Sequence, residues 1–378
     1  MTTREEAMSS FPAAGIDVAR AAELVPRELT VYCPIALPDN PFDVDDIERQ
    51  AVEWCQEHGL WRPAGASVTM DAAVGMTSAL PTASEDLVVA ATRYFYWGAL
   101  LDDYWDTLAD DLPRIAAHAG ELDRALFATP TAPLPRGDLW AAALRDLRAQ
   151  FVAVLGTPCF AALQHENAVW LNGQLWYSAV RRRETRPGVG EYLRMRWVNS
   201  GVGTLIPFTA AAAGCRGLDA WQLGDPAVRA FAEAVMFSCA LLNDLFSIAK
   251  ELVTGTAATN LYSVLAHAEG LDTAECLVKG WQLYERLVAL VVRLREQLLT
   301  DPRPDVVLLA GDLPNWIPAA VGWASTTARY YQVDRGDRAT CFTPPELVVS
   351  DAPSLWDPEN LTPPPYPEIA WWWATIER

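Results

Sequence analysis

Three side chains that carry oxygen atoms stand four residues apart in one apolar segment. Asn243, Ser247 and Glu251 lie in AVMFSCALLNDLFSIAKE, whose apolar pattern predicts a helix. The spacing places them on one face of that helix, each about 6 Å beyond the last. An amide oxygen, a hydroxyl and a carboxylate form a hard ligand set, which suits Mg²⁺ rather than zinc or copper. The alternative is a polar helix face turned toward water.

A group of carboxylates ends a second apolar segment, ATRYFYWGALLDDYWD. Asp102 and Asp106 are four residues apart in this predicted helix, so their like charges lie close together, with Asp103 beside them. An acidic loop explains the later Asp110 and Asp111 better than it explains Asp102. Carboxylates beside apolar side chains are costly unless cations neutralise them, and Mg²⁺ shared with substrate phosphates would do so. Two such clusters over an aromatic interior suit a substrate with a diphosphate head and a hydrocarbon tail.

These two clusters resemble the two metal motifs of the bacterial class I terpene synthases (terpene cyclases). DDYWD matches the motif DDxxD, and NDLFSIAKE matches NDxxSxxxE at every defining position. EYLRMRWVNSG resembles the segment in which an arginine contacts diphosphate before the helix breaks, and KELVTGTAATNLYSVL and NWIPAAVGWASTTARY follow in the family's order. The resemblance covers roughly residues 31–335. It departs at Ala99, where relatives often have an aromatic residue, and at Ser200, where they often have glycine.

The resemblance implies an all-α, single-domain helical fold around a central apolar cavity. It also implies an enzyme that ionises and cyclises geranylgeranyl or farnesyl diphosphate and releases diphosphate. Three Mg²⁺ ions per active site would be bound by Asp102, Asp106, Asn243, Ser247 and Glu251. Diphosphate would be bound by Arg196, Asn243, Lys250, Arg329 and Tyr330. The residues expected to take part in catalysis are Asp102, Asp103, Arg196, Asn199, Ser200, Arg329 and Tyr330. Asp102 and Asn243 should then face each other across the cavity mouth.

Aromatic side chains are the expected walls of that cavity, because aromatic faces stabilise a carbocation without reacting with it. Phe95 lies seven residues before Asp102 on the same helical face, and Trp323 and Trp176 are the next candidates. Ordinary core packing explains each of the three equally well. Ala99 lies about one turn before Asp102, and its small side chain would leave room for a twenty-carbon substrate. We therefore favour geranylgeranyl diphosphate, although the fifteen-carbon substrate is the commoner one for such enzymes.

Other helical proteins fit the sequence less well. A chain-elongating isoprenyl diphosphate synthase of the same fold carries two aspartate-rich motifs, whereas the second motif here has Asn, Ser and Glu. A non-catalytic isoprenoid-binding protein would show damaged metal ligands, and none is damaged here. A haem or di-iron protein needs histidine ligands or Glu-x-x-His pairs, which the chain lacks. Taken singly, however, Arg196 could be a surface arginine, Lys250 a solvated lysine and Tyr330 a packing residue.

Composition narrows the class of partner and the compartment. The net charge of −19 argues against binding to nucleic acid or an anionic membrane, and no apolar run reaches the ~20 uncharged residues that a membrane span needs. The N-terminus lacks the pattern of a signal peptide, and seven scattered cysteines predict reduced thiols in the cytoplasm. The four histidines have no zinc-ligand spacing. We expect a cytoplasmic monomer or homodimer whose partner is its small-molecule substrate.

Helices must position these residues, since almost nothing alternates as a strand would. We expect a flexible segment at 1–30, a catalytic domain at 31–335 and a Pro/Trp-rich tail at 336–378 that ends in Trp371, Trp372 and Trp373 before the last residues. That tail could pack across its own domain, dock a partner or cover the active site. Helical patterns cover 43–60, 84–110, 137–155, 159–184, 188–214, 226–254, 258–268, 272–299 and 306–332, with a break expected at 199–201.

Overall fold

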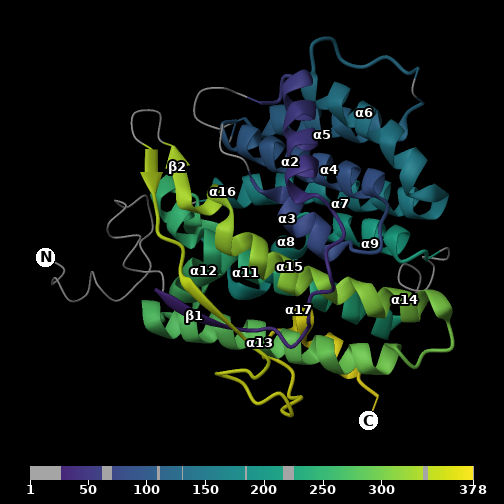
Figure 1. The fold of residues 1–378 in the computed structure, drawn as a ribbon. Coiled ribbons are helices and arrows are strands. Elements are labelled where there is room, and N and C mark those ends of the chain that lie inside the picture. Colours follow the sequence, from purple (N-terminus) through teal and green to yellow (C-terminus); the bar gives the residue numbers. More distant parts are fainter. Residues whose placement is uncertain are drawn as a thin grey trace, which may run out of the picture.

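Helices form almost all of the protein in the computed structural model, which describes residues 27–61, 70–108, 111–129, 131–183, 185–215, 225–334 and 339–377. Figure 1 shows the long helix α11 (Pro226–Thr254) in the middle of the bundle. The other α-helices are α2 (Val44–Glu57), α3 (Ala72–Ala79), α4 (Glu85–Asp106), α5 (Leu112–Phe127), α6 (Leu139–Val154), α7 (Gly156–Arg181), α8 (Val189–Asn199), α9 (Ile206–Ala212), α12 (Leu261–Glu269), α13 (Thr273–Leu298), α14 (Pro304–Asp312), α15 (Trp316–Thr326), α16 (Ala328–Tyr331) and α17 (Pro367–Ala370). Short 3₁₀ helices are η2 (Val202–Leu205), η3 (Ala257–Thr259), η4 (Leu313–Asn315) and η5 (Trp371–Thr375).

Strands are few and short. β1 (Glu28–Tyr32) pairs in parallel with β4 (Glu346–Ser350), and β2 (Gln332–Asp334) pairs antiparallel with β3 (Ala339–Cys341). Neither pair extends into a larger sheet within the described part of the chain. The expected all-α fold is therefore confirmed. Most of the N-terminal segment expected at 1–30 lies outside the described residues.

Local sequence signals explain where the site-bearing helices begin and end. Asp225 caps α11 by accepting hydrogen bonds from two backbone N–H groups of its first turn, and Pro226 occupies the first helical position. Gly255, with φ of +80°, ends the same helix in the left-handed conformation that glycine adopts freely. Ser84 caps α4 in the same way as Asp225 caps α11. Two helices carry one metal motif each, and both start at a strong cap.

The helical segment expected at 188–214, with a break at 199–201, is divided into α8, η2 and α9. Gly201 has φ of +72°, and a side chain there would meet the Trp170 ring at 3.2 Å. The left-handed backbone therefore interrupts the helix at the expected place. The segment expected at 306–332 is likewise divided, into α14, η4, α15 and α16. Three α-helices, α3, α5 and α17, lie where no helix was expected.

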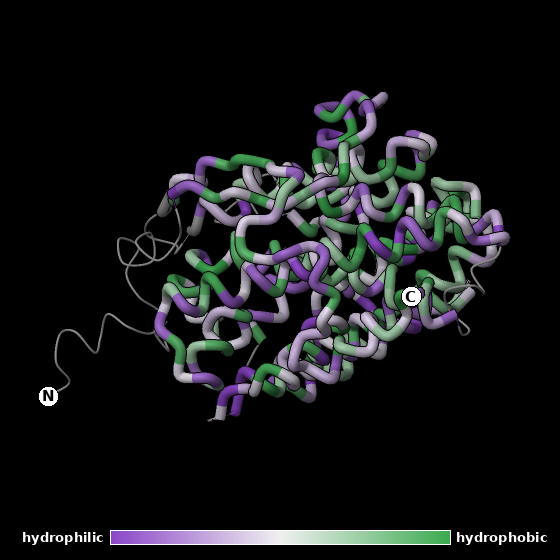
Figure 2. The backbone as a smooth tube through the Cα atoms, turned by 90° about the horizontal axis from the view of Figure 1, so that it is seen from below, coloured by the Kyte–Doolittle hydropathy of each residue, from purple (hydrophilic) through white to green (hydrophobic). Residues whose placement is uncertain are grey.

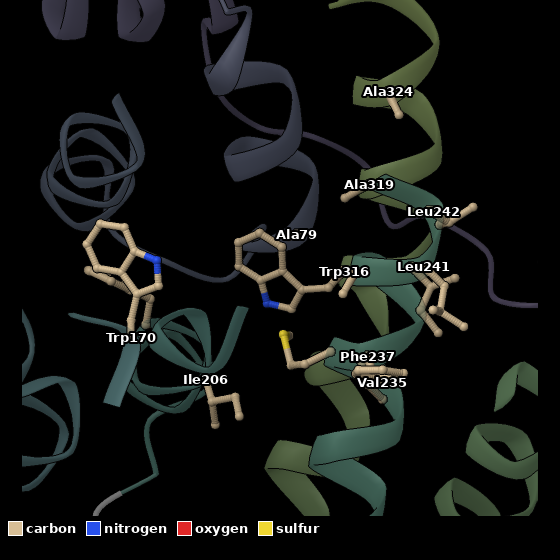
Figure 3. Close-up of a cluster of buried hydrophobic side chains, with 14 of the residues drawn as sticks. Ala79, Trp170, Ile206, Val235, Phe237, Leu241, Leu242, Trp316, Ala319 and Ala324 are labelled. Atoms are coloured by element: carbon tan, nitrogen blue, oxygen red, sulfur yellow. The ribbon is translucent and has the colours of Figure 1, made fainter. Parts of the chain in front are cut away.

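The core lies around α11, which contacts α13 and α15 along its length. Trp316 lies at the centre of one buried cluster, with Trp170 and Ile206 on one side and Phe237 on the other (Figure 3). Its indole N–H donates to Thr209 Oγ1 at 2.7 Å, which satisfies the one polar group of this buried ring. Hydrophobic and hydrophilic residues alternate along most of the chain (Figure 2), as amphipathic helices require.

Among the described helices, α11 alone is long and apolar enough to cross a membrane by length and composition. Its most apolar window is 94% buried inside the protein, as expected of a helix at the centre of a core.

The C-terminal segment wraps around the outside of α13 and ends against α11 (Figure 1). Glu285 of α13 is fully buried, and its carboxylate accepts hydrogen bonds from the Ser354 N–H, the Ser354 hydroxyl and the Leu355 N–H at 2.7–2.9 Å. Farther on, the Trp372 indole N–H donates to Glu233 Oε2 of α11 at 2.8 Å. Trp372 and Trp373 are buried, while Trp371 is 38% exposed. Most of the tryptophan surface is thus covered by the protein's own helices.

Helices α7 and α8 approach each other closely at Gly173. A Cβ atom on Gly173 would lie 2.5 Å from the backbone carbon of Val198 and 2.8 Å from the backbone nitrogen of Asn199. Backbone atoms cannot move aside as the end of a side chain can. Trp170 and Gln174, on the same helix, both donate to the Asn199 carbonyl, at 3.2 and 2.9 Å. The glycine therefore sets the position of the C-terminal end of α8.

Gly173→Ala is expected to lower the free energy of unfolding by about 3 kcal/mol, because the added methyl group must push two packed helices apart. Chemical denaturation of the variant and the wild type measures the difference. Gly311→Ala in α14 is the matched control, since its Cβ would meet no atom of the described residues within 4 Å. An equal stability of both variants would contradict the tight contact between α7 and α8.

Candidate active site

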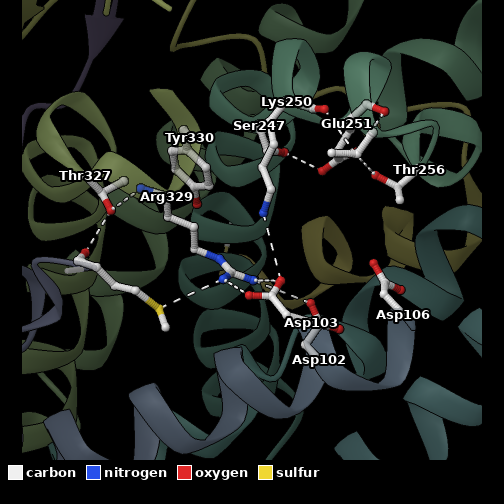
Figure 4. Close-up of polar contacts among 12 residues, drawn as sticks. Asp102, Asp103, Asp106, Ser247, Lys250, Glu251, Thr256, Thr327, Arg329 and Tyr330 are labelled. Atoms are coloured by element: carbon white, nitrogen blue, oxygen red, sulfur yellow. Dashed lines mark hydrogen bonds and ion pairs between the residues drawn. The ribbon is translucent and has the colours of Figure 1, made fainter. Parts of the chain in front are cut away.

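The carboxylates of the first motif lie in the last turn of α4, at the negative end of the helix dipole. Arg329 of α16 binds Asp103 with both arms of its guanidinium, Nη1 to Oδ2 at 2.7 Å and Nη2 to Oδ1 at 2.9 Å (Figure 4). Its Nη2 is also 3.7 Å from Asp102 Oδ2, and the Lys250 ammonium is 4.0 Å from Asp103 Oδ1. Forked arginine–carboxylate pairs are strong and directional. Asp103 is therefore held by basic side chains.

The second motif faces the same place from α11. The Ser247 hydroxyl donates to Glu251 Oε1 at 2.5 Å, and the Asn260 amide donates to Glu251 Oε2 at 3.1 Å. The Asn243 amide donates to the hydroxyl of Tyr330. Tyr330 directly follows the arginine that binds the α4 carboxylates, so α16 connects the two motifs. Figure 4 shows both groups of side chains directed toward one region between α4 and α11.

Arg196 of α8 is buried beside the second motif. Its Nη2 is 2.7 Å from Asp244 Oδ1 and 2.5 Å from Asn243 Oδ1. Asp244 also accepts from the Tyr192 hydroxyl at 2.6 Å and from the Leu261 N–H at 2.7 Å. The buried Nε of Arg196 has no hydrogen-bond partner among the described residues. A buried donor with no protein partner leaves capacity to bind an anion.

Two further residues that were expected to take part in catalysis, Asn199 and Ser200, lie at the helix break that follows Arg196. The Asn199 side-chain oxygen is buried and lacks a hydrogen-bond partner within the described ranges, while its backbone carbonyl accepts from α7. The Ser200 hydroxyl donates weakly to the Trp197 carbonyl at 3.4 Å. Within the described residues, neither the Asn199 nor the Ser200 side chain forms a hydrogen bond to either metal motif.

Two residues of α7 also reach the site, although they belong to no recognisable motif. Arg181 donates to Asp106 Oδ1. Its guanidinium lies over the Tyr177 ring, with 5.2 Å between the guanidinium carbon Cζ and the ring centroid. The carboxylates of Asp102, Asp106 and Glu251 all raise the pKa of Tyr177, after burial, which has the largest effect. The C-terminal end of α7 therefore also lines the site, together with α4 and α11.

Aromatic rings lie next to the first motif. Phe95 of α4 packs edge-on against Trp323 at 5.3 Å between centroids, and Trp323 packs against Tyr330 at 5.3 Å. The Trp323 indole N–H is satisfied by the Met70 carbonyl at 2.7 Å. Ala99 is half-buried on the same helix as Phe95, while the Trp176 indole donates to Glu191 at 3.4 Å in the α7–α8 contact. The structure brings Phe95 and Trp323 together and places Trp176 in a different contact.

The electrostatics of the carboxylates favour a bound cation. Burial, and after it the neighbouring carboxylates of Asp106 and Asp103, raise the pKa of Asp102 to about 7, although Arg329 and Lys250 lower it. Burial also raises the pKa of Glu251, and Asp244 adds to the effect. Carboxyl groups that gain protons so readily lack sufficient positive charge nearby. Because the donors are carboxylate, amide and hydroxyl oxygens, the residues present fit Mg²⁺.

Comparison with known proteins relates the whole chain to one family. The profile described as terpene synthase family 2, C-terminal metal binding, matches residues 93–289, which include both motifs. The chain is 28% identical over 359 residues to bonnadiene synthase of Allokutzneria albata, covering 91% of this chain and 96% of that protein. It is 24% identical to (+)-T-muurolol synthase ((2E,6E)-farnesyl diphosphate cyclizing) of Streptomyces clavuligerus, with coverages of 93% and 83%. The crystal structure of the SVS_A2 protein from ancestral sequence reconstruction matches with a TM-score of 0.69 at 25% identity, covering 92% of this chain and 98% of that one.

Proposed function

Because this chain belongs to terpene synthase family 2 and is a terpene cyclase, we propose that it ionises geranylgeranyl or farnesyl diphosphate in a Mg²⁺-dependent reaction and cyclises the resulting cation. The observation that carries this proposal is the connection of two oxygen-ligand motifs through Arg329 and Tyr330. One diphosphate group could contact both motifs at once.

The proposed metal ligands divide between the two helices. Asp102 and Asp106 of α4 and Asn243, Ser247 and Glu251 of α11 would bind Mg²⁺, and three ions would complete the site. Bound Mg²⁺ would act as a Lewis acid that stabilises the departing diphosphate.

The chain's own basic residues would bind and orient the diphosphate. Arg196, Lys250 and Arg329 supply three positive charges within the same site, and Tyr330 supplies a hydroxyl. Arginine is well suited to phosphate oxygens because its donors form a fork. We propose that Asp103 keeps Arg329 in place, and that Asn199 and Ser200 act at the helix break when substrate is bound. In this proposal the Phe95 and Trp323 rings stabilise the cation, with Trp176 a further candidate.

Incubation of the purified protein with the ten-, fifteen- and twenty-carbon diphosphates and Mg²⁺ tests this function. Gas chromatography of the extracts should show a cyclic terpene from the fifteen- or the twenty-carbon substrate. The absence of any cyclic product from all three substrates would refute the proposal.

Ala99→Phe is expected to decrease turnover of the twenty-carbon substrate by about tenfold or more, since overpacking a fitted space costs ~1–3 kcal/mol. The fifteen-carbon substrate should be turned over as before or faster. Ala99 lies about one helical turn before Asp102, so a large side chain there would occupy space just below the diphosphate. Steady-state rates with both substrates measure the effect.

Ala142→Phe, on an exposed face of α6, is the matched control and should leave both rates unchanged. An equal loss of both activities in the Ala99 variant would make Ala99 a packing position and remove the support for a twenty-carbon substrate.

The remaining parts of the proposal concern the whole molecule. Six cysteines are free thiols, which supports a cytoplasmic location: Cys33, Cys55, Cys159, Cys215, Cys239 and Cys276. We further propose that residues 31–335 form the catalytic domain, that the segment 336–378 covers its outer surface, and that the protein is a monomer or homodimer. Light scattering after gel filtration measures the oligomeric state.

A further inference from the structure

Arg181 binds the carboxylate of Asp106, which the proposed function assigns to a metal ion. It is the last residue of α7, and its Nη1 donates directly to Asp106 Oδ1. The Arg181 side chain is 18% exposed and that of Asp106 is 33% exposed, so solvent reaches both. Tyr177, one turn earlier, provides a ring face under the guanidinium. The contact is therefore built from two residues of one helix, and it is not a chance surface pair.

The other acids near the two motifs have different partners. Asp103 is bound by Arg329, with Lys250 nearby, and Asp244 is bound by Arg196. Arg329 also lies 3.7 Å from Asp102, and Arg196 donates to Asn243, but each of these arginines keeps an aspartate partner of its own. Those two aspartates are not among the expected metal ligands, so their pairs can persist when metal binds. Asp106 is an expected ligand, and a guanidinium and a divalent cation on the same carboxylate oxygen would repel each other. Metal binding at this oxygen of Asp106 therefore requires Arg181 to move.

The location of Arg181 makes such a movement easy. Its long side chain projects from the end of a helix, so rotation about its own bonds can carry the charge several ångströms without moving α7. By contrast, Arg196 is held beside Asp244, whose side chain is only 3% exposed. A released guanidinium would still face a site that, on the proposed function, then contains a diphosphate.

Resting on the proposed function, we propose that Arg181 is an exchangeable counterion. It neutralises Asp106 in the substrate-free protein and moves to the diphosphate of the substrate when Mg²⁺ takes its place. Arg181 thus couples the two binding events. It weakens the binding of Mg²⁺ alone and strengthens the binding of Mg²⁺ together with diphosphate.

Arg181→Gln tests this coupling because it should change two affinities in opposite directions. Thermal unfolding of the full chain is followed across a titration with MgCl₂ alone, and calorimetry then measures the binding of inorganic diphosphate at saturating Mg²⁺. Compared with the wild type, the Mg²⁺ midpoint should fall by about tenfold and the Kd for diphosphate should rise by about tenfold, which is ~1.4 kcal/mol each. A residue with a purely structural role would weaken both or change neither.

Arg183→Gln is the matched control, because Arg183 is 43% exposed and pairs with Glu191 at the surface. It should behave as the wild type in both titrations. Arg181→Lys keeps the positive charge but lacks the forked donors of arginine, so it should keep the wild-type Mg²⁺ midpoint. If the glutamine variant does not fold, the lysine variant is tested in its place. The inference is overturned if Arg181→Gln leaves either affinity equal to that of Arg183→Gln while the wild type forms product. A wild type that forms no product and binds no diphosphate would refute the proposed function itself.

Discussion

Removal of divalent cations with EDTA is expected to abolish product formation, and Mg²⁺ but not Zn²⁺ is expected to restore it. Every expected ligand is an oxygen donor, on Asp102 and Asp106 of one helix and on Asn243, Ser247 and Glu251 of the other. Zn²⁺ prefers nitrogen and sulfur ligands in a tetrahedral arrangement, whereas Mg²⁺ prefers oxygen ligands in an octahedral one. Product formation is measured by gas chromatography after chelation and after addition of each metal.

The loss of activity should occur without loss of the fold. Arg329 and Arg181 neutralise part of the α4 carboxylate charge. The protein should therefore stay folded after chelation, and its thermal unfolding midpoint should fall only by the amount that the loss of bound Mg²⁺ accounts for. Undiminished product formation after thorough chelation would exclude the metal-dependent mechanism. A large fall in the unfolding midpoint would indicate that the metal has a structural role instead.

The sequence predicted the long helices well, because a strong hydrophobic period over many residues leaves few alternatives. α4, α7, α11 and α13 lie within a few residues of their expected limits. α3 was missed because AAVGMTSA consists mostly of small residues and six of its eight residues are buried, so no polar face marks it as a helix. Its neighbours Trp323 and Glu48 stabilise it from outside: Trp323 packs on Gly75, and Glu48 accepts from the Ala73 N–H. Such a helix forms because of tertiary contacts, and a local sequence pattern does not reveal them.

The candidate site was predictable where a motif defines it and not elsewhere. Spacing alone placed Asn243, Ser247 and Glu251 on one face, and the structure directs Ser247 and Glu251 toward the region that faces the α4 carboxylates. Arg181 belongs to the run Arg181, Arg182, Arg183, and nothing in that run distinguishes the residue that meets Asp106. Helix α7 brings it there through packing against α8 and α5. Residues that enter a site only through helix packing need a three-dimensional structure to be found.

The C-terminal tryptophans show how burial resolves an ambiguity of composition. Three adjacent tryptophans were compatible with packing on the protein's own domain, with partner docking or with a cover over the active site. In the structure, Trp372 packs at 5.9 Å against Phe237 and bonds to Glu233, both in the N-terminal half of α11. The metal motif lies in the C-terminal half of that helix. The tail therefore contacts the helix on the part that does not carry metal ligands.

Glu251→Gln is expected to lower turnover by about a thousandfold, because loss of a direct ligand should exceed the ~10–100-fold lost when a partner of a ligand is removed. Glu251 accepts from Ser247 at 2.5 Å and from Asn260 at 3.1 Å, so its carboxylate already has a fixed orientation. Glutamine has the same shape but lacks the negative charge that holds Mg²⁺. Steady-state rates and the Mg²⁺ dependence of the remaining activity measure the effect.

Glu269→Gln is the control for Glu251→Gln, since Glu269 pairs with Lys279 at the surface and lies on another helix, α12. It should retain full activity. Asn260 caps α12 as well as contacting Glu251, so the unfolding midpoint of the Glu251 variant must be compared with the wild type. A stable Glu251→Gln protein with wild-type turnover would show that the carboxylate serves only as a hydrogen-bond acceptor for Ser247 and Asn260. It would remove α11 from the metal site, because Asn243 and Ser247 carry no charge with which to hold Mg²⁺ alone.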